Sequence, residues 1–209
     1  MVKVANNKLR VGTLVMLSDQ QTIQEEMDKN NYVSGVDAKV VEVTEYTEQN
    51  GNLKISVAKL DRENNYVITV EASDGEYYSV LAFVPDAFSV NGFPGGNRVD
   101  LLDAGFHWLF NPPDNLLDEN FKANTLEFSK EMNNERDGEV ANFIPLHDTL
   151  YGTSSENKLF AFAHYRADRE WDNTECFILE HGDLEDEAGG YITFFQGAIL
   201  NDGELEVLK

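Results

Sequence analysis

Apolar and polar residues alternate along much of the chain with the period of two that is typical of β-strands. The alternation is clearest between residues 39 and 84, where the dipeptides Asn50-Gly51 and Asp74-Gly75 and one further polar turn interrupt it. Asn-Gly and Asp-Gly between alternating segments are strong hairpin signals. This part of the chain therefore predicts an antiparallel meander of four strands.

Further strands are predicted on both sides of the meander. Residues 9–17 alternate in the same way and give the N-terminal portion a fifth strand. Near the C-terminus, charged or glycine-containing turns separate the segments KLFAFAHY, TECFILEH, YITFFQGAIL and ELEVL. We expect each of these segments to form a strand.

Helix signals are fewer. Ser18 is suited to cap a helix, and Gln21 stands three residues later at the capping-box position. An apolar pair at i, i+4 follows, so a short surface helix is predicted near residues 19–29. Residues 114–131 fit a helix face in one part and a strand in another, and both alternatives stay open.

Together these elements predict a β-rich α+β protein. It would consist of two antiparallel β units, each a meander or a small barrel-like sheet, with one or two short helices. Four of the five prolines fall in residues 85–113, which is typical of a boundary between lobes. We therefore expect an N-terminal unit over 1–90 and a C-terminal unit over 91–209, and one continuous domain is the alternative.

The net charge is the extreme property of this sequence. Its 16 Lys and Arg residues against 38 Asp and Glu residues give a formal net charge of −22. The acidity is spread along the chain, and no segment gathers the lysines and arginines of a basic stripe. A field of this sign repels phosphates, so we expect neither direct nucleic-acid binding nor docking on an anionic membrane. A basic protein is the partner that it favours.

The expected location is the cytoplasm. The first residues carry charge and asparagine where a signal peptide needs a continuous apolar stretch. No later run reaches the roughly 18 apolar residues of a membrane span. The single cysteine, Cys176, forms no internal disulfide and suits a reducing compartment. We expect a soluble cytoplasmic protein without membrane insertion, and its oligomeric state stays open.

One acidic loop is the candidate partner-contact site. In HGDLEDEAGG, four carboxylates fall within five residues: Asp183, Glu185, Asp186 and Glu187. The segment lacks the ligand order and the glycine of a calcium-binding EF-hand loop. A solvated connection between two strands is the leading interpretation, and a docking surface for a basic partner is the alternative.

No catalytic, cofactor or metal site is predicted. A pair of Cys176 with a histidine is conceivable, because His164, His181 and Asp172 are near it in the sequence. The segment TECFILE, however, places apolar residues on both faces of a strand, so Cys176 is expected to be buried and inert. The histidines form no metal-binding motif; they are His107, His147, His164 and His181.

The chain also resembles a known family in its outline. The resemblance lies in the opening LRVGTLVMLSD, the β-rich half that follows, the central WLF segment and the closing YITFFQGAILNDGELEVL. These features resemble the bacterial family of unknown function typified by the YjfK protein. The resemblance implies a soluble cytoplasmic accessory protein of unassigned activity and assigns no site residues.

Three functions are compatible with these observations. The leading hypothesis is an acidic accessory or interaction protein that binds a basic protein partner without catalysis. Within this hypothesis, a charge that only confers solubility is the open alternative. One alternative is a hydrolase or transferase with a site assembled from dispersed residues and a pocket lined by aromatic residues such as Trp108, Phe110 or Trp171. The other alternative is a structural component of a larger assembly.

Overall fold

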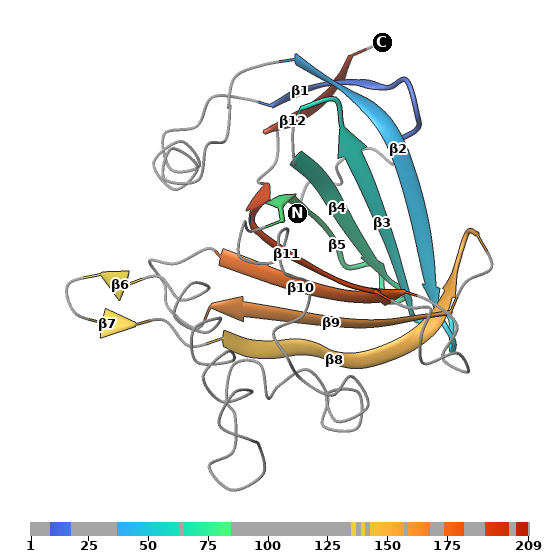
Figure 1. Ribbon diagram of the computed structural model, residues 1–209, viewed down its shortest axis with the longest axis vertical. Coiled ribbons are helices and arrows are strands. Elements are labelled where there is room, and N and C mark those ends of the chain that lie inside the picture. The colour runs from blue at the N-terminus through green and yellow to red at the C-terminus, as the bar shows by residue number, and fades with distance from the viewer. Residues whose placement is uncertain are drawn as a thin grey trace, which may run out of the picture. The chain divides into compact units, whose positions relative to one another are not determined.

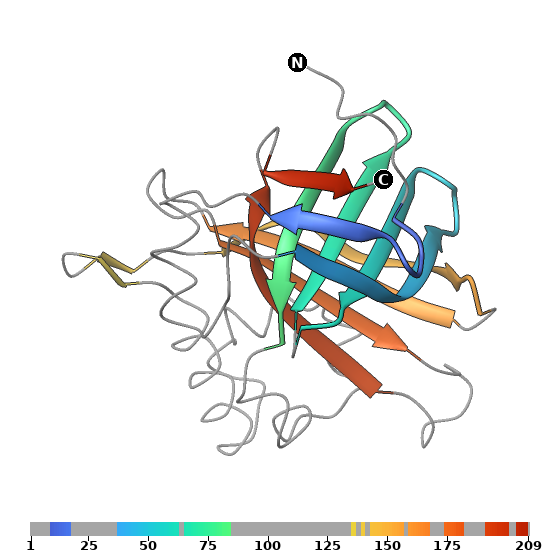
Figure 2. The same ribbon diagram turned by 90° about the horizontal axis from the view of Figure 1, so that it is seen from above.

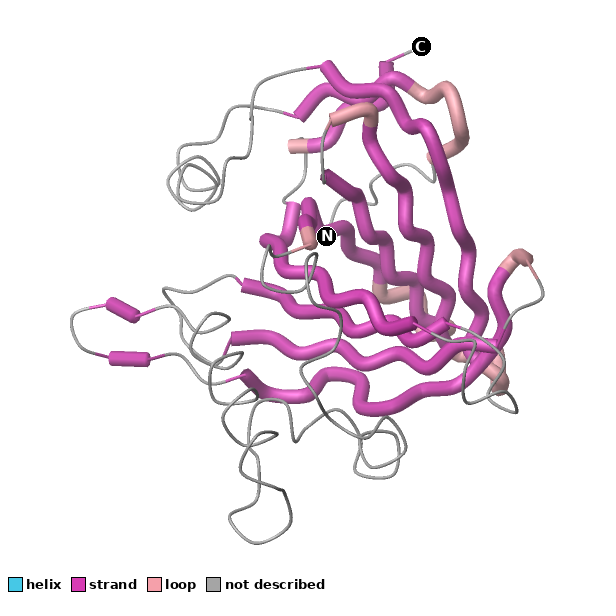
Figure 3. The backbone as a smooth tube through the Cα atoms, viewed as in Figure 1, coloured by secondary structure: helices cyan, strands magenta, loops and turns pink. Residues whose placement is uncertain are grey.

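The computed structural model describes residues 9–17, 37–62, 65–84, 135–136, 139–140, 143–156, 159–167, 174–181, 191–200 and 204–208. Every regular element within these ranges is a β-strand, as Figure 3 shows by its colours. Among them there is no helix long and apolar enough to cross a membrane.

The expected α+β class is wrong, because the described part of the chain is all-β. The helix content of that prediction came only from residues 19–29 and 114–131, and both segments lie outside the described residues. A capping signal marks where a helix can begin without fixing the class of the fold. The period-two alternation was the stronger signal, and each segment predicted from it within the described ranges contains a strand. The strand predicted over residues 9–17 is shorter than expected and spans only Leu14–Leu17.

The chain divides into two compact units. Unit 1 comprises Met1–Phe83 and Ala198–Lys209, and unit 2 comprises Val84–Gly197. Residues from both ends of the sequence thus contribute to unit 1.

Unit 1 contains a sheet in the order β12-β1-β2-β3-β4-β5. Its strands are β1 (Leu14–Leu17), β2 (Asp37–Glu48), β3 (Leu53–Leu60), β4 (Asn65–Ala72), β5 (Tyr77–Phe83) and β12 (Leu205–Leu208). Strands β2 to β5 pair antiparallel in sequence order, which confirms the predicted meander. Figure 2 shows β1 between β12 and β2, and β1 pairs antiparallel with both.

Two tight turns hold this meander in register. The backbone N–H of Gly51 donates to the carbonyl of Glu48 at 2.8 Å, and that of Gly75 donates to the carbonyl of Ala72 at 3.0 Å. Both glycines adopt positive φ, 73° and 90°, which glycine reaches without a steric penalty. The Asn-Gly and Asp-Gly signals in the sequence therefore correspond to real turns.

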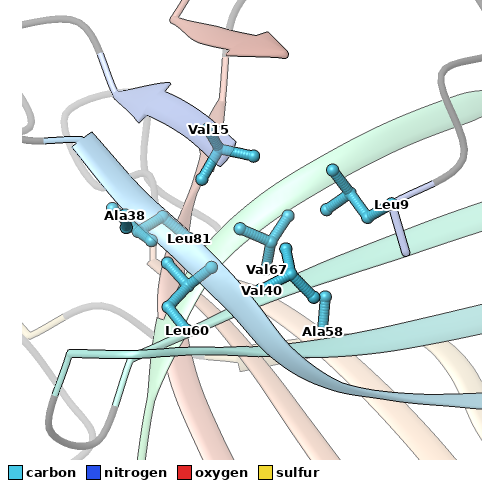
Figure 4. Close-up of a cluster of buried hydrophobic side chains, with 8 residues drawn as sticks. All are labelled: Leu9, Val15, Ala38, Val40, Ala58, Leu60, Val67 and Leu81. Atoms are coloured by element: carbon cyan, nitrogen blue, oxygen red, sulfur yellow. The ribbon is translucent and has the colours of Figure 1, made fainter. Parts of the chain in front are cut away.

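One part of the core of unit 1 is an apolar cluster at one end of its sheet, shown in Figure 4. Its members come from β1 to β5 and from the segment before β1, and all are buried: Leu9, Val15, Ala38, Val40, Ala58, Leu60, Val67 and Leu81. Leu205 and Val207 of β12 pack against the cluster. Burial of this apolar surface is the main favourable term that holds β1 and β12 on the meander.

Unit 2 contains β8 (Phe143–Ser154), β9 (Leu159–Ala167), β10 (Thr174–His181) and most of β11 (Tyr191–Leu200), in the order β11-β10-β9-β8. The last three residues of β11 belong to unit 1. Figure 1 shows β8, β9 and β10 side by side. A separate two-stranded ladder joins β6 (Glu135–Arg136) and β7 (Glu139–Val140). Strand β8 was not predicted, because Pro145 and the polar residues of this strand break the alternation of apolar and polar positions.

Replacement of Leu60 by alanine tests the core of unit 1. The Leu60 side chain is 2% exposed within the cluster, so its loss leaves a cavity. We expect the free energy of unfolding to fall by about 2–5 kcal/mol in urea denaturation. The control is Leu14→Ala, because the Leu14 side chain on β1 is 45% exposed. This substitution should change the free energy of unfolding by less than about 0.5 kcal/mol. Equal effects of the two substitutions would contradict the assignment of the core.

Candidate functional site

Polar side chains meet on one face of the β9–β10 ladder in unit 2. The two strands are antiparallel, with Glu175 directly opposite Arg166 and Phe177 directly opposite His164. Residues that face each other across a ladder point to the same side of the sheet, and residues two apart on one strand share that side. The register therefore brings one carboxylate, one guanidinium and one imidazole together.

Both oxygens of the Glu175 carboxylate have a partner. Nε of Arg166 donates to Oε1, and Nε2 of His164 hydrogen-bonds to Oε2. An ionised carboxylate only accepts hydrogen bonds, so Nε2 of His164 carries the proton of this bond. The three residues form a connected network, called the Glu175 network below.

The network is buried at its centre. The side chains of Glu175 and His164 are 0% exposed, whereas that of Arg166 is 36% exposed. An unpaired charge at this depth would be costly, and the guanidinium balances the carboxylate. The balanced pair then needs only a neutral imidazole, which donates a hydrogen bond without adding a charge.

Aromatic rings surround the imidazole. The His164 ring stacks on Phe177, with centroids 4.2 Å apart and an interplanar angle of 12°. The centroid of the Phe162 ring lies 6.4 Å from the centroid of the His164 ring, and that of the His147 ring on β8 lies 5.9 Å from it. The face thus changes along β9 from an apolar, aromatic end at Phe160 to a polar end at Arg166.

Irregular pairing places His147 beside the network. The β8–β9 register shifts between Pro145 and His147 and again between His147 and Leu150. Such irregularities commonly re-aim a side chain. His147 stands opposite His164 in the ladder, so two histidines that are far apart in the sequence become neighbours.

Cys176 lies on the other face of β10. It stands opposite Tyr165, one position away from the Phe177–His164 pair, so its side chain points away from His164. The predicted alternation of this strand and the burial of Cys176 are confirmed. The conceivable Cys176–His164 pair does not form, and its third member, Asp172, lies outside the described residues. Burial raises the pKa of the Cys176 thiol, and the charge of Glu175 raises this pKa further.

The other residues considered from the sequence are not brought to this site. The acidic loop with Asp183, Glu185, Asp186 and Glu187 lies outside the described residues, although its flanking strands β10 and β11 are neighbours in the sheet. His107 and the aromatic residues Trp108, Phe110 and Trp171 also lie outside them. For His181, the structure describes the backbone position in β10 alone.

The geometry favours a structural role for the Glu175 network. A histidine oriented by a carboxylate is a common arrangement around a catalytic base. Here, however, the imidazole and the carboxylate are both fully buried, and the carboxylate has a partner on each oxygen. Within the described ranges, no group of three or more histidine, cysteine or acidic side chains is placed to hold a metal ion. The arrangement fixes two strands together through a satisfied set of buried polar groups.

Sequence reasoning missed this network although a signal for it exists. His164 and Arg166 alternate with Tyr165, and Glu175 opens a segment that is otherwise apolar, TECFILE. Polar residues on the predicted inward face of neighbouring strands indicate a buried pair. The register that joins them could not be obtained from the sequence, because the charged segment RADREWDN between the two predicted strands contains no Asn-Gly or Asp-Gly signal from which to count.

No protein-family model, curated protein or solved structure matches this chain. The resemblance to the family typified by the YjfK protein therefore stays a prediction.

Replacement of Glu175 by alanine should remove the centre of the network. It leaves the guanidinium of Arg166 and the imidazole of His164 without their shared acceptor, so we expect a loss of about 3–5 kcal/mol in the free energy of unfolding. Glu175→Gln should cost less, because the amide keeps hydrogen-bonding atoms in place. Urea denaturation of both variants gives the two values. Glu206→Ala removes an exposed carboxylate and is the control; a loss no larger than in this control would contradict the account.

Cys176 should be protected from thiol reagents in the folded protein. Its burial and its raised pKa both disfavour the reactive thiolate. In a colorimetric thiol assay at pH 8, we expect a reaction at least about 100-fold slower than in denaturing urea, because it requires opening of the strand. A Ser73→Cys variant carries a cysteine in an exposed turn, and that cysteine should react rapidly. Equally rapid modification of Cys176 would place it at the surface.

Proposed function

We propose that this protein is an acidic accessory protein that binds a basic protein partner and needs no catalytic site to do so. The observation that carries the proposal is the net charge of −22. A charge of this size exceeds the magnitude of roughly 2–8 that is sufficient for the solubility of a small domain. It also speeds encounter with a partner of opposite charge and rejects partners of like charge.

The distribution of charge in the described residues supports the proposal. Among the described residues of unit 2, the buried carboxylate of Glu175 is neutralised by Arg166 and is not available to a partner. Exposed carboxylates lie on the strands and turns of unit 1, among them Glu42, Glu71, Glu76 and Glu206. Each exposed pair with a partner would contribute little by itself, so binding would depend on many charges together.

The acidic loop of Asp183, Glu185, Asp186 and Glu187 is the proposed centre of this interaction. Its four carboxylates form the densest acidic cluster singled out in the sequence. The loop connects β10, which carries Glu175, to β11. Loops on a rigid sheet commonly carry binding residues because the sheet fixes their ends.

Affinity capture with a salt gradient tests the proposal. The tagged full chain is immobilised, exposed to native lysate at low ionic strength and eluted with increasing salt, and the eluate is identified by mass spectrometry. We expect one basic protein to leave within a narrow range of salt, because screening weakens contacts between exposed charges. Retention of no basic protein above bare resin would contradict the proposal.

Two variants with the same net charge distinguish binding through the acidic loop from binding through the overall negative charge. The first converts Asp183 and Asp186 to asparagine and Glu185 and Glu187 to glutamine. The control converts four exposed carboxylates of unit 1 to glutamine: Glu42, Glu71, Glu76 and Glu206. We expect the loop variant to lose the partner and the control to keep most of the binding; equal losses would assign the binding to net charge and not to this loop.

A further inference from the structure

The turn between β2 and β3 contains a dipeptide that is open to spontaneous chemical modification. Asn50 is followed by Gly51, and both residues are exposed. In an Asn-Gly pair, the glycine nitrogen can attack the side-chain amide carbon of asparagine, because glycine has no side chain to obstruct the approach. A Cβ placed at Gly51 would meet no atom of the described residues within 4 Å, so these residues do not shield the position by packing. Any protection by them comes from hydrogen bonds.

Glu48, the last residue of β2, makes these hydrogen bonds. Its side chain is 8% exposed. Oε1 accepts a hydrogen bond from Nδ2 of Asn50 at 2.9 Å, and Oε2 accepts one from the backbone N–H of Asn52 at 3.0 Å. The carbonyl oxygen of Glu48 accepts a hydrogen bond from the backbone N–H of Gly51 at 2.8 Å. Glu48 thus holds the nitrogen that would attack through its backbone and the amide that would leave through its side chain.

The neighbouring turn also supports this arrangement. The backbone N–H of Ser73, which follows β4, donates to the carbonyl of Asn52 at 2.8 Å. A hydrogen bond to a charged group shifts an equilibrium by a factor of about ten or more. The two bonds to the Glu48 carboxylate should therefore keep the turn folded most of the time.

We propose that Asn50-Gly51 is a deamidation site and that Glu48 blocks the reaction in the folded chain. In this reaction the Gly51 nitrogen forms a bond to Cγ of Asn50, the Cγ–Nδ2 bond breaks, and the proton of the Gly51 nitrogen leaves with Nδ2 as ammonia. Water then opens the resulting succinimide at one of its two carbonyl carbons, which leaves aspartate or isoaspartate at position 50. The reaction needs no reactant besides water, and the inference is independent of the proposed function.

The modification would weaken the turn that fixes the register of β2 and β3. The new carboxylate at position 50 cannot donate to Glu48, and it would stand beside a carboxylate of the same charge. Isoaspartate also adds one carbon atom to the main chain, so the bond from Gly51 to the carbonyl of Glu48 would no longer fit. The site therefore connects a brief opening of the turn to an irreversible change in the hairpin.

Mass spectrometry of the full chain during prolonged incubation tests the proposal. One sample is kept folded in neutral buffer and a second in denaturing urea, and the peptide that contains Asn50 is assayed for deamidation and for isoaspartate. We expect the folded chain to react at least about tenfold more slowly, because the reaction requires opening of the turn. Asn52 in the same peptide is the internal control, since the side chain of Leu53 obstructs the attack there. Equal rates at Asn50 in the two samples overturn the proposal.

Variants separate the effect of Glu48 from that of overall stability. Glu48→Ala should speed deamidation of the folded chain by about tenfold. Glu76→Ala removes an exposed carboxylate after the next turn of the meander, and Leu60→Ala weakens the apolar cluster of unit 1. Both controls should stay within about twofold of the wild type, because neither touches the bonds of this turn.

Two results with these variants would overturn the proposal. Equal acceleration in Leu60→Ala would assign the protection to overall stability and not to Glu48. A slower reaction in Glu48→Ala would make the carboxylate a base that promotes deamidation.

Amide hydrogen exchange on the wild type gives a test that does not depend on the folding of any variant. The amides of Gly51 and Asn52 should exchange at least about tenfold more slowly than in the unfolded chain, because both donate to Glu48. Exchange of both amides at the rate of the unfolded chain overturns the proposal.

Discussion

The buried carboxylate of Glu175 is the constraint on which the described part of unit 2 depends. A charged group without solvent contact needs partners, and Glu175 has them in Arg166 and His164 on the neighbouring strand. A slip of one residue would lose both partners, because it would move Arg166 and His164 to the opposite face from Glu175. The apolar residues of β9 and β10 favour burial in general, whereas the carboxylate disfavours alignments that are slipped by one residue.

The two units use different means to define their structure. Unit 1 has short glycine turns that fix the register of its meander, and an apolar cluster that attaches β1 and β12. The described strands β9 and β10 are buried on both faces, so the alternation of polar and apolar residues cannot orient them. In β9 and β10 the buried polar network helps to fix the alignment of the strands, as alternation and short turns do in unit 1.

Local features of the sequence predicted the strands of the meander, but they predicted neither the all-β class of the described residues nor the long-range pairings. The meander followed from alternation together with Asn50-Gly51 and Asp74-Gly75, which specify hairpins within a few residues. The pairing of β1 with β12 joins residues such as Leu14 and Leu208, and no local signal encodes it. Strand β8 was missed because Pro145 and its register shifts hide the period of two. The Glu175 network was missed because it depends on the register between strands and not on a motif.

Buried charged groups and exposed carboxylates have separate roles in the proposed function. In the described part of unit 2, the buried charge of Glu175 is paired with Arg166 and holds two strands together, whereas exposed carboxylates such as Glu42 and Glu206 are ones that a basic partner would meet. The most direct test of this account is a nitrogen–proton NMR measurement of the His164 imidazole in the folded protein at neutral pH. The account predicts a neutral ring with its proton on Nε2, hydrogen-bonded to Glu175. A proton on Nδ1, or an average of both forms, would contradict it.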